Sequence, residues 1–254
     1  MKTEQKKLDY INKECNTDYK SLDEVDWYYI SMNQTITEDF IREFADKIEW
    51  VGISYTQKLS ERFIREFQND VDWEGISMKQ NISEDFIQEF KDKVDWYWIS
   101  RYQKLTENFI RECQDKVEWD YISECQTLSE PFIREFKDKV DWHNISAYQI
   151  LSERFIIEFQ DYVDLDLILE YQSLSESFIR ENQDKVDWYI VSRYQKLSED
   201  FIREFQDKVD WRCISAYQIL SKELLREFKD KIDWSTFLNR EDIRDMLIDK
   251  LLFN

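Results

Sequence analysis

The side chains that usually carry out catalysis or hold metals are few in this chain and do not cluster. His143 is the only histidine, and the residues at multiples of 23 from it vary and include Tyr, Glu, Arg and Ser, so we interpret it as a surface variant. The four cysteines, Cys15, Cys113, Cys125 and Cys213, show no CxxC spacing. Metal sites need His and Cys at set spacings. The sequence therefore predicts no metal and no cofactor, and Cys113 is expected to be a small core residue.

Acidic residues are abundant, but their arrangement is repetitive. With only Gly52 and Gly75, the chain has no glycine-rich loop for a phosphate. A catalytic carboxylate pair would occur once, whereas the acidic residues here recur every 23 residues. The pattern favours a protein that is not an enzyme. The most regular acidic position, interpreted as a contact between repeats, holds Glu43, Glu66, Glu89, Glu112, Glu135, Glu158, Glu181, Glu204 and Glu227.

The spacing of the tryptophans sets the organisation of the chain. From Trp27 to Trp234 there are 207 residues, which is nine intervals of 23, and Leu165 holds the only position on this grid without tryptophan. A repeat of 20–50 residues is typical of solenoids and arrays. The tryptophans on the grid are Trp27, Trp50, Trp73, Trp96, Trp119, Trp142, Trp188, Trp211 and Trp234.

Composition narrows the fold class and the partners. Hydrophobic residues make up 42% of the chain, and Gly52, Gly75 and Pro131 are its only strong helix breakers, which indicates an all-α protein. A net charge of −20 makes nucleic acid and anionic membranes unlikely partners, because both bind mainly to Lys and Arg. No apolar run of 18 residues and no signal-peptide pattern occur. We expect a soluble protein in the reducing cytoplasm.

Each repeat is predicted to hold two helices. In the repeat that starts at Asp95, this residue can cap a first helix of about eight residues. Trp96, Ile99, Ser100 and Gln103 follow at the spacing of one helix face. The small serine would let helices approach closely. Because a buried amide needs hydrogen-bond partners, the glutamine is expected to bond to backbone at the turn between helices.

The second helix is predicted to have about twelve residues and to begin after a Ser or Thr such as Ser198. Phe201, Ile202, Phe205 and Val209 form its apolar stripe. Its other face is charged, and Glu204 and Lys208 are examples of oppositely charged residues spaced by four. We interpret this face as a solvated helix surface.

Together these patterns predict one α-solenoid domain over residues 1–254. It would be a superhelix of nine to ten helix–turn–helix repeats over residues 26–236. Residues 1–25 would form an N-terminal cap with a helix over residues 2–14, in which Leu8 and Ile11 face inward. Residues 237–254 would form a C-terminal capping helix, over residues 241–252.

The wording of the repeat supports a general resemblance. Trp-x-x-Ile-Ser-x-Tyr-Gln-x-Leu-Ser-Glu-x-Phe-Ile-Arg-Glu-Phe-x-Asp-Lys-Val-Asp resembles tandem repeats in uncharacterised proteins of giant DNA viruses, over residues 26–236. The architecture is similar to tetratricopeptide-type solenoids, although the unit is shorter and lacks that family's motif. The resemblance implies a scaffold and a viral origin, and no activity.

The positions that vary within the constant frame are the candidate binding residues. They lie one, two, five and eight places after the tryptophan position, and positions one, five and eight share a stripe of the first helix. Tyr, Trp, Met and Arg, which are enriched at protein interfaces, recur there. We call this set the variable ribbon. Its candidate contact residues are Tyr28, Tyr55, Glu74, Tyr97, Trp98, Arg101, Asp120, Tyr121, Glu124, His143, Asn144, Tyr189, Arg193 and Arg212.

Several interpretations of the ribbon remain open at this stage. The leading one is a protein or peptide partner, and neutral drift at surface sites is the alternative without function. A modular single-stranded nucleic-acid reader is possible in principle, since helical repeats can read one base each. A structural, self-associating rod is a further alternative. The uniform sixth position, which includes Tyr102 and Tyr217, is expected to pack between repeats.

One repeat departs from the frame at several positions together. Leu165 replaces Trp, Leu169 replaces Ser, and Asn182 replaces Phe. On the charged face, Ile157 replaces Arg and Tyr162 replaces Lys. Exposed apolar residues that cluster usually mark an interaction site. Ile157 and Tyr162 are therefore a candidate second contact surface, for self-association or for a partner, unless the chain buries them locally.

Overall fold

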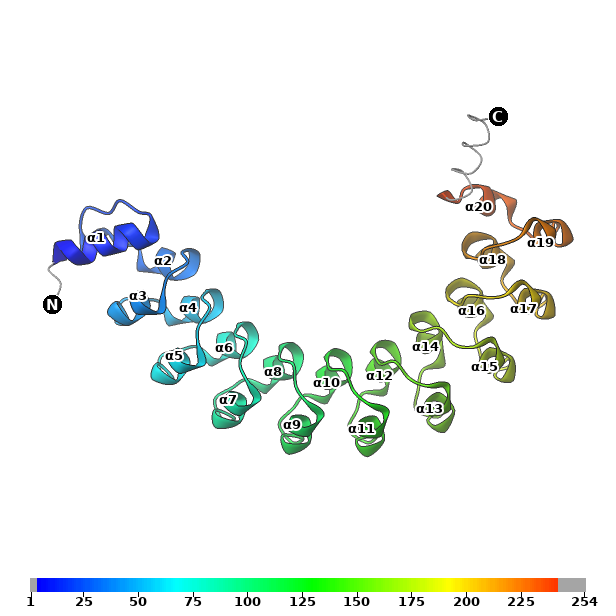
Figure 1. The fold of residues 1–254 in the computed structure, drawn as a ribbon, viewed down its shortest axis with the longest axis horizontal. Coiled ribbons are helices and arrows are strands. Elements are labelled where there is room, and N and C mark those ends of the chain that lie inside the picture. Colours follow the sequence, from blue (N-terminus) through cyan, green and yellow to red (C-terminus); the bar gives the residue numbers. More distant parts are fainter. Residues whose placement is uncertain (1–3, 242–254) are drawn as a thin grey trace, which may run out of the picture. The chain divides into compact units, whose positions relative to one another are not determined.

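A computed structural model describes residues 4–241, and all regular structure in that range is helical. Helix α1 covers Glu4–Cys15, and a short 3-10 turn covers Leu22–Glu24. From Trp27 onward two short helices alternate at the 23-residue spacing (Figure 1). The prediction of an all-α solenoid is confirmed.

The first helix of each repeat begins at the tryptophan position. Seven residues is its usual length, close to the predicted eight. These helices are α2 (Trp27–Asn33), α4 (Trp50–Thr56), α6 (Trp73–Lys79), α8 (Trp96–Tyr102), α10 (Trp119–Cys125), α12 (Trp142–Tyr148), α14 (Leu165–Tyr171), α16 (Trp188–Tyr194), α18 (Trp211–Tyr217) and α20 (Trp234–Leu238).

The second helix has six residues, so the predicted length of about twelve is wrong. After Phe205, for example, whose φ of −107° and ψ of 27° leave the helical region, the chain continues in turns. These turns bring Val209 back into the core. The second helices are α3 (Glu38–Glu43), α5 (Glu61–Glu66), α7 (Glu84–Glu89), α9 (Glu107–Glu112), α11 (Glu130–Glu135), α13 (Glu153–Glu158), α15 (Glu176–Glu181), α17 (Glu199–Glu204) and α19 (Lys222–Glu227).

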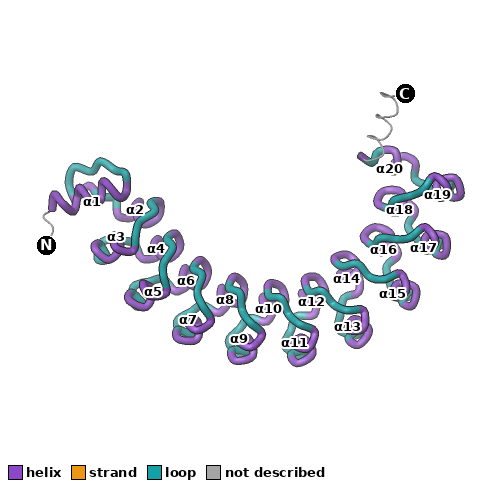
Figure 2. Tube along the Cα trace, in the orientation of Figure 1, coloured by secondary structure: helices purple, strands orange, loops and turns teal. Residues whose placement is uncertain are grey.

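The chain divides into two compact units, Met1–Gln126 and Thr127–Asn254. In the first unit α2, α4, α6, α8 and α10 pack in succession, and in the second α12, α14, α16, α18 and α20 do so. Within each unit the first helices form one row and the second helices another (Figure 2). A single domain over residues 1–254 stays a prediction.

The N-terminal end of the repeat array is covered as expected. In α1, Leu8 and Ile11 are buried, and the ring of Tyr10 lies 5.6 Å from that of Phe40 in the first repeat. The predicted C-terminal capping helix, over residues 241–252, lies outside the described residues apart from Glu241.

Side-chain caps explain where the helices begin. The Ser198 hydroxyl accepts a hydrogen bond from the backbone N–H of Phe201, and the second helix of every repeat begins in this way. The first helix begins after Asp72, whose carboxylate accepts the N–H of Gly75 at 2.8 Å. Glu49 stands at the same position without a side-chain cap, because its longer side chain does not reach back.

The glutamine that recurs at the end of each first helix joins its repeat to the one before it. The Gln80 side chain donates to the carbonyls of Ser54 and Gln57 and accepts the N–H of Leu59. The predicted bonds to turn backbone are thus confirmed, and all three partners lie in the preceding repeat. Since each of these polar groups is buried, the glutamine satisfies backbone that no helix of that repeat could satisfy.

The serine of the first helix has a second role that its small size did not reveal. Ser77 is fully buried, donates to the Trp73 carbonyl at 2.7 Å and accepts the N–H of Asp95 in the next repeat at 2.9 Å. Where Leu169 replaces the serine, no hydroxyl is available to the N–H of Asp187, and burial raises the pKa of the nearby Asp166 carboxyl.

The tryptophan is half-buried. Trp73 packs against Phe90 in a tilted arrangement with ring centroids 4.9 Å apart. Its Nε1 donates to the Gln68 carbonyl at 3.1 Å, and the ammonium of Lys93 lies 5.6 Å from its ring centre. The fully buried aromatic side chain is the Phe of the second helix, such as Phe86. The indole thus closes the edge of the core.

The charged face forms contacts between repeats in addition to contacts within one helix. Glu204 pairs with Arg180 of the preceding repeat at 2.7 Å, and Lys208 contacts Asp184 and lies over the Trp188 ring. The predicted contact between repeats for the invariant glutamate is confirmed. Glu204 pairs with an arginine one repeat away, so the expected partner four residues on, Lys208, is not its partner.

Candidate functional site

The fourteen candidate residues of the variable ribbon all lie on first helices, and none of them is buried. Their exposure follows from the frame. Ile and Ser of the first helix face the core, so positions one and five of the same helix face away from it. The structure brings some of them together in two clusters, one in each compact unit.

The first cluster, which we call the Arg101 cluster, consists of Tyr97, Trp98, Arg101, Tyr102 and Tyr121. The Tyr121 hydroxyl donates to that of Tyr97 at 2.8 Å, and this bond raises the pKa of Tyr121. The Arg101 guanidinium lies 5.0 Å from the Tyr121 ring centre and 5.6 Å from that of Tyr102. Trp98 stacks on Tyr102 at 5.6 Å. A cation held between ring faces in this way is a common feature of recognition surfaces.

The second cluster, the Arg193 cluster, consists of Tyr189, Arg193, Tyr194 and Tyr217. Arg193 donates to the Tyr189 hydroxyl at 2.7 Å and lies over the rings of Tyr194 and Tyr217 at 5.1 and 5.2 Å. Tyr189, Arg193 and Tyr217 line a hollow of about 240 Å³ together with Arg212 and others. Arg101 and Arg193 lie 92 residues, or four repeats, apart in the chain, and each has a Tyr four residues before it and a Tyr directly after it.

The two arginines differ from those of the second helices. Arg65, for example, is neutralised by Glu89 at 2.7 Å. Within residues 4–241, by contrast, neither Arg101 nor Arg193 forms an ion pair with a carboxylate. A guanidinium that contacts only phenol rings and hydroxyls keeps its charge and part of its donor fork available for a ligand carboxylate.

Tyr55 and Glu74 form a smaller contact in the first unit. The Tyr55 ring lies over Gly75, where a Cβ would come within 2.7 Å of it. Burial, together with the nearby Glu74 carboxylate, raises the pKa of Tyr55 to about 12. Gly75 is therefore required for close approach of the ring.

The remaining candidates are not gathered into a cluster. Tyr28 is exposed at the start of α2, and Asp120 and Glu124 lie along α10. His143 and Asn144 begin α12, and His143 borders a hollow beside Tyr162. The assignment of all fourteen residues to partner binding stays a prediction.

Sequence reasoning missed part of this surface. The sixth-position tyrosines were expected to pack between repeats, but Tyr102 and Tyr217 are about half exposed. The guanidinium groups of Arg101 and Arg193 lie over their rings. Two residues further along, Ile150 and Ile219 are 90% and 89% exposed. The recurrence of tyrosine at the sixth position suggested that these side chains are buried, although a surface repeated in each unit can equally explain it. The one signal for Ile150 and Ile219 was their apolar type at a position otherwise often Lys.

At the candidate second contact surface, packing within the chain accounts for Tyr162 but not for Ile157. Tyr162 stands where other repeats have the lysine above the tryptophan, and its ring lies 5.1 Å from that of Trp142. An aromatic contact thus replaces a cation over the same indole. Ile157 is half exposed and borders a cavity next to Leu165. A role of both residues in association stays a prediction.

The side chains of His, Cys, Asp and Glu nowhere gather in threes suitable for a metal ion between residues 4 and 241. All four cysteines are free. Burial raises the pKa of Cys213 to about 11 and also raises the pKa of Cys113. Cys113 is buried, as predicted. In the described part of the chain, the helices are too short and too polar to span a bilayer.

Comparison with known proteins found no matching protein family, no matching curated protein and no matching solved structure. The tandem helical repeat is therefore established by the chain's own periodicity and by the structure. The resemblance to repeats of giant DNA viruses gains no support from these comparisons.

Proposed function

We propose that this protein is a non-catalytic repeat scaffold that binds a protein or peptide partner through the variable ribbon. The observation that carries the proposal is the pair of clusters around Arg101 and Arg193. Each holds a cation that has no carboxylate partner within the described residues and lies among exposed or partly exposed tyrosines, in a protein of net charge −20. Tyr, Trp and Arg are the residues most enriched among the energetically dominant contacts of interfaces.

The chemistry of the clusters indicates the kind of segment that would bind. A guanidinium beside phenol hydroxyls fits a carboxylate, and the surrounding rings fit an apolar or aromatic neighbour. We therefore infer that the partner segment carries an Asp, a Glu or a C-terminal carboxylate next to a hydrophobic residue. The acidic frame around the clusters would repel segments with several carboxylates, which limits the choice to isolated ones.

Peptide display provides the test. A random peptide library would be selected on the wild-type protein and on Arg101→Ala combined with Arg193→Ala. The control is Arg62→Ala combined with Arg154→Ala, which removes one exposed arginine per unit from the second helices. Peptides enriched on wild type and control, but lost on the cluster variant, would support the proposal. Equal enrichment on all three proteins would contradict it.

The alternatives predict other outcomes. Tight, salt-sensitive retention of single-stranded RNA in a filter assay at low salt would replace the peptide proposal with a nucleic-acid reader, since stacking on Tyr and Arg also suits bases. An apparent molar mass, measured by light scattering, that rises with protein concentration would indicate a self-associating rod. We place the activity in a reducing, intracellular compartment because all four cysteines are free thiols; a viral origin rests on the wording of the repeat alone.

A further inference from the structure

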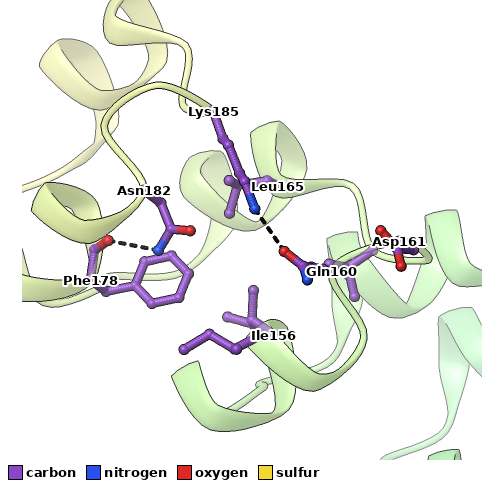
Figure 3. Close-up of a pocket in the computed structure, with 9 residues that line it drawn as sticks. Ile156, Gln160, Asp161, Leu165, Phe178, Asn182 and Lys185 are labelled. Atoms are coloured by element: carbon purple, nitrogen blue, oxygen red, sulfur yellow. Dashed lines mark hydrogen bonds between the residues drawn. The ribbon is translucent and has the colours of Figure 1, made fainter.

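The repeat that lacks tryptophan contains a cavity of about 300 Å³. It lies among α13, α14 and α15, all within the second compact unit. Figure 3 shows Leu165, Phe178 and Ile156 on its walls, with Gln160, Asn182 and Lys185 at its polar side. None of the fourteen ribbon candidates lines it.

The neighbouring repeats show what occupies this space in the regular frame. In the repeat of Trp188, the indole packs against Phe205 in a tilted arrangement with ring centroids 4.9 Å apart. Its Nε1 donates to the Gln183 carbonyl at 3.1 Å, and the ammonium of Lys208 lies 5.7 Å from the ring centre. The repeat of Trp73 in the other unit has the same geometry.

In the cavity repeat the two rings are missing, but their surroundings remain. Leu165 stands at the tryptophan position and Asn182 at the position of the stacked Phe. Gln160, which supplies the carbonyl for the indole, and Lys185, which covers it, are both present. The Lys185 ammonium donates to Gln160 Oε1 at 2.7 Å (Figure 3), and no hydrogen bond to the Gln160 carbonyl is found among the described residues.

A third replacement opens the edge of the cavity. In regular repeats an arginine covers the buried Phe of the next second helix, as Arg134 does over Phe155 at 4.8 Å. The corresponding residue here is Ile157, which is shorter and half exposed. Asn182 does not fill the gap either, because its amide turns back to donate to the Phe178 carbonyl at 2.9 Å (Figure 3).

We propose that this cavity is a receptor site for the indole side chain of a tryptophan presented by another polypeptide. The cavity keeps the acceptor carbonyl of Gln160, the cation of Lys185 and the ring of Phe178, which are the groups that hold an indole in the other repeats. An incoming indole would restore the ring contact with Phe178, which corresponds to the stacked contact of Trp188 with Phe201 at 6.2 Å, together with the N–H···O bond and the cation–π contact. Its volume lies at the lower end of the range for ligand sites.

The surroundings of the cavity favour a polypeptide as the source of the indole. A second hollow adjoins it, shares Val163, Leu165 and Lys185, and is also bordered by Asp164 and Asp166. Backbone N–H groups of a bound segment can donate to these carboxylates. The site thus offers an apolar socket for the ring and a polar rim for the main chain. This inference does not depend on the ribbon and therefore stands or falls separately from the proposed function.

Fluorine NMR on the full chain tests the site. The probes are 5-fluoroindole and the acetylated amide of 5-fluorotryptophan, each expected to bind saturably with a dissociation constant on the order of 1 mM. Leu165→Trp with Asn182→Phe restores the repeat's own residues, so it should fold and weaken binding of both probes at least about tenfold. Cys113→Phe, which fills the equivalent Phe position beside Trp96, is the matched control and should leave binding unchanged.

A further ligand checks the hydrogen bond. In competition with 5-fluoroindole, 1-methylindole, which lacks the N–H, should bind about fivefold more weakly than indole because it cannot donate to the Gln160 carbonyl. Absence of binding by the wild type up to the solubility limit would overturn the proposal. So would equal binding by the filled variant, and binding of 5-fluoroindole without the tryptophan amide would exclude a polypeptide side chain as the occupant.

Discussion

The side-chain amide of Gln80 donates a hydrogen bond of 2.7 Å to the main-chain carbonyl of Gln57, the residue at the same position one repeat earlier. Gln57 in turn donates to Gln34, and Gln103 to Gln80, at 2.7 and 2.8 Å. A run of identical side chains thus connects backbone to backbone along the first unit. Each glutamine is a link between two repeats, so its loss should weaken the interface rather than one helix.

Replacing Gln80 by Leu should lower the free energy of unfolding by about 3 kcal/mol, because the buried N–H of Leu59 and the carbonyls of Ser54 and Gln57 would lose partners. Urea denaturation followed by circular dichroism measures the change. Lys79→Leu, at the exposed neighbour, should change stability by less than about 0.5 kcal/mol. Equal effects of the two substitutions would contradict a linking role of the glutamine.

Replacing Leu165 by Trp should raise the free energy of unfolding by about 1–2 kcal/mol, because the indole would fill the cavity and donate to the Gln160 carbonyl. The reverse change in a regular repeat, Trp73→Leu, should lower it by about 2–4 kcal/mol, since it removes the stack on Phe90 and the bond to Gln68. Thermal and urea unfolding compare the two variants with the wild type. A destabilised Leu165→Trp protein would show that the cavity differs in shape from the other tryptophan sites.

Acid should destabilise the interfaces between repeats through Glu199. Hydrogen bonds from the side chain and backbone of Ser221 hold the pKa of Glu199 below its ordinary value of 4.5. A carboxylate with a lowered folded-state pKa stabilises the fold fully above the unfolded pKa and loses this contribution as pH falls through the folded one. The urea concentration at the unfolding midpoint should therefore decrease as the pH is lowered below about 4.5. Glu199→Gln should show a shallower dependence in that range, and an unchanged slope would exclude a contribution from this group.

Replacing Gly75 by Ala should displace the Tyr55 ring, because the new Cβ would come within 2.7 Å of it. The ring would become more exposed, and the pKa of Tyr55 should move down from about 12 toward the usual value of a phenol. NMR titration of the tyrosine ring carbons, with Tyr55→Phe to assign the signal, measures the shift. Gly52→Ala, which meets the flexible Met32 side chain instead, should leave the Tyr55 pKa unchanged.

The sequence by itself determined the solenoid, the positions of the helix starts and the bonding of the repeated glutamine to turn backbone. A strict 23-residue grid, Ser and Asp before each helix, and a glutamine that must be satisfied when buried left few alternatives. The sequence also singled out Arg101, Arg193 and the repeat around Leu165. These features depend on residue type and spacing, which are local and directly visible.

Only the tertiary structure decided the length of the second helix, the dual bonding of Ser77 and the exposure of Tyr102 and Tyr217. Each of these depends on contacts between residues about one repeat apart, where no spacing rule within a helix applies. The same reason explains why the changes at Ile157, Leu165 and Asn182 surround one cavity. The periodic sequence shows that these residues differ from those at the same positions of other repeats. Packing between successive helices determines that the three side chains lie around the same cavity.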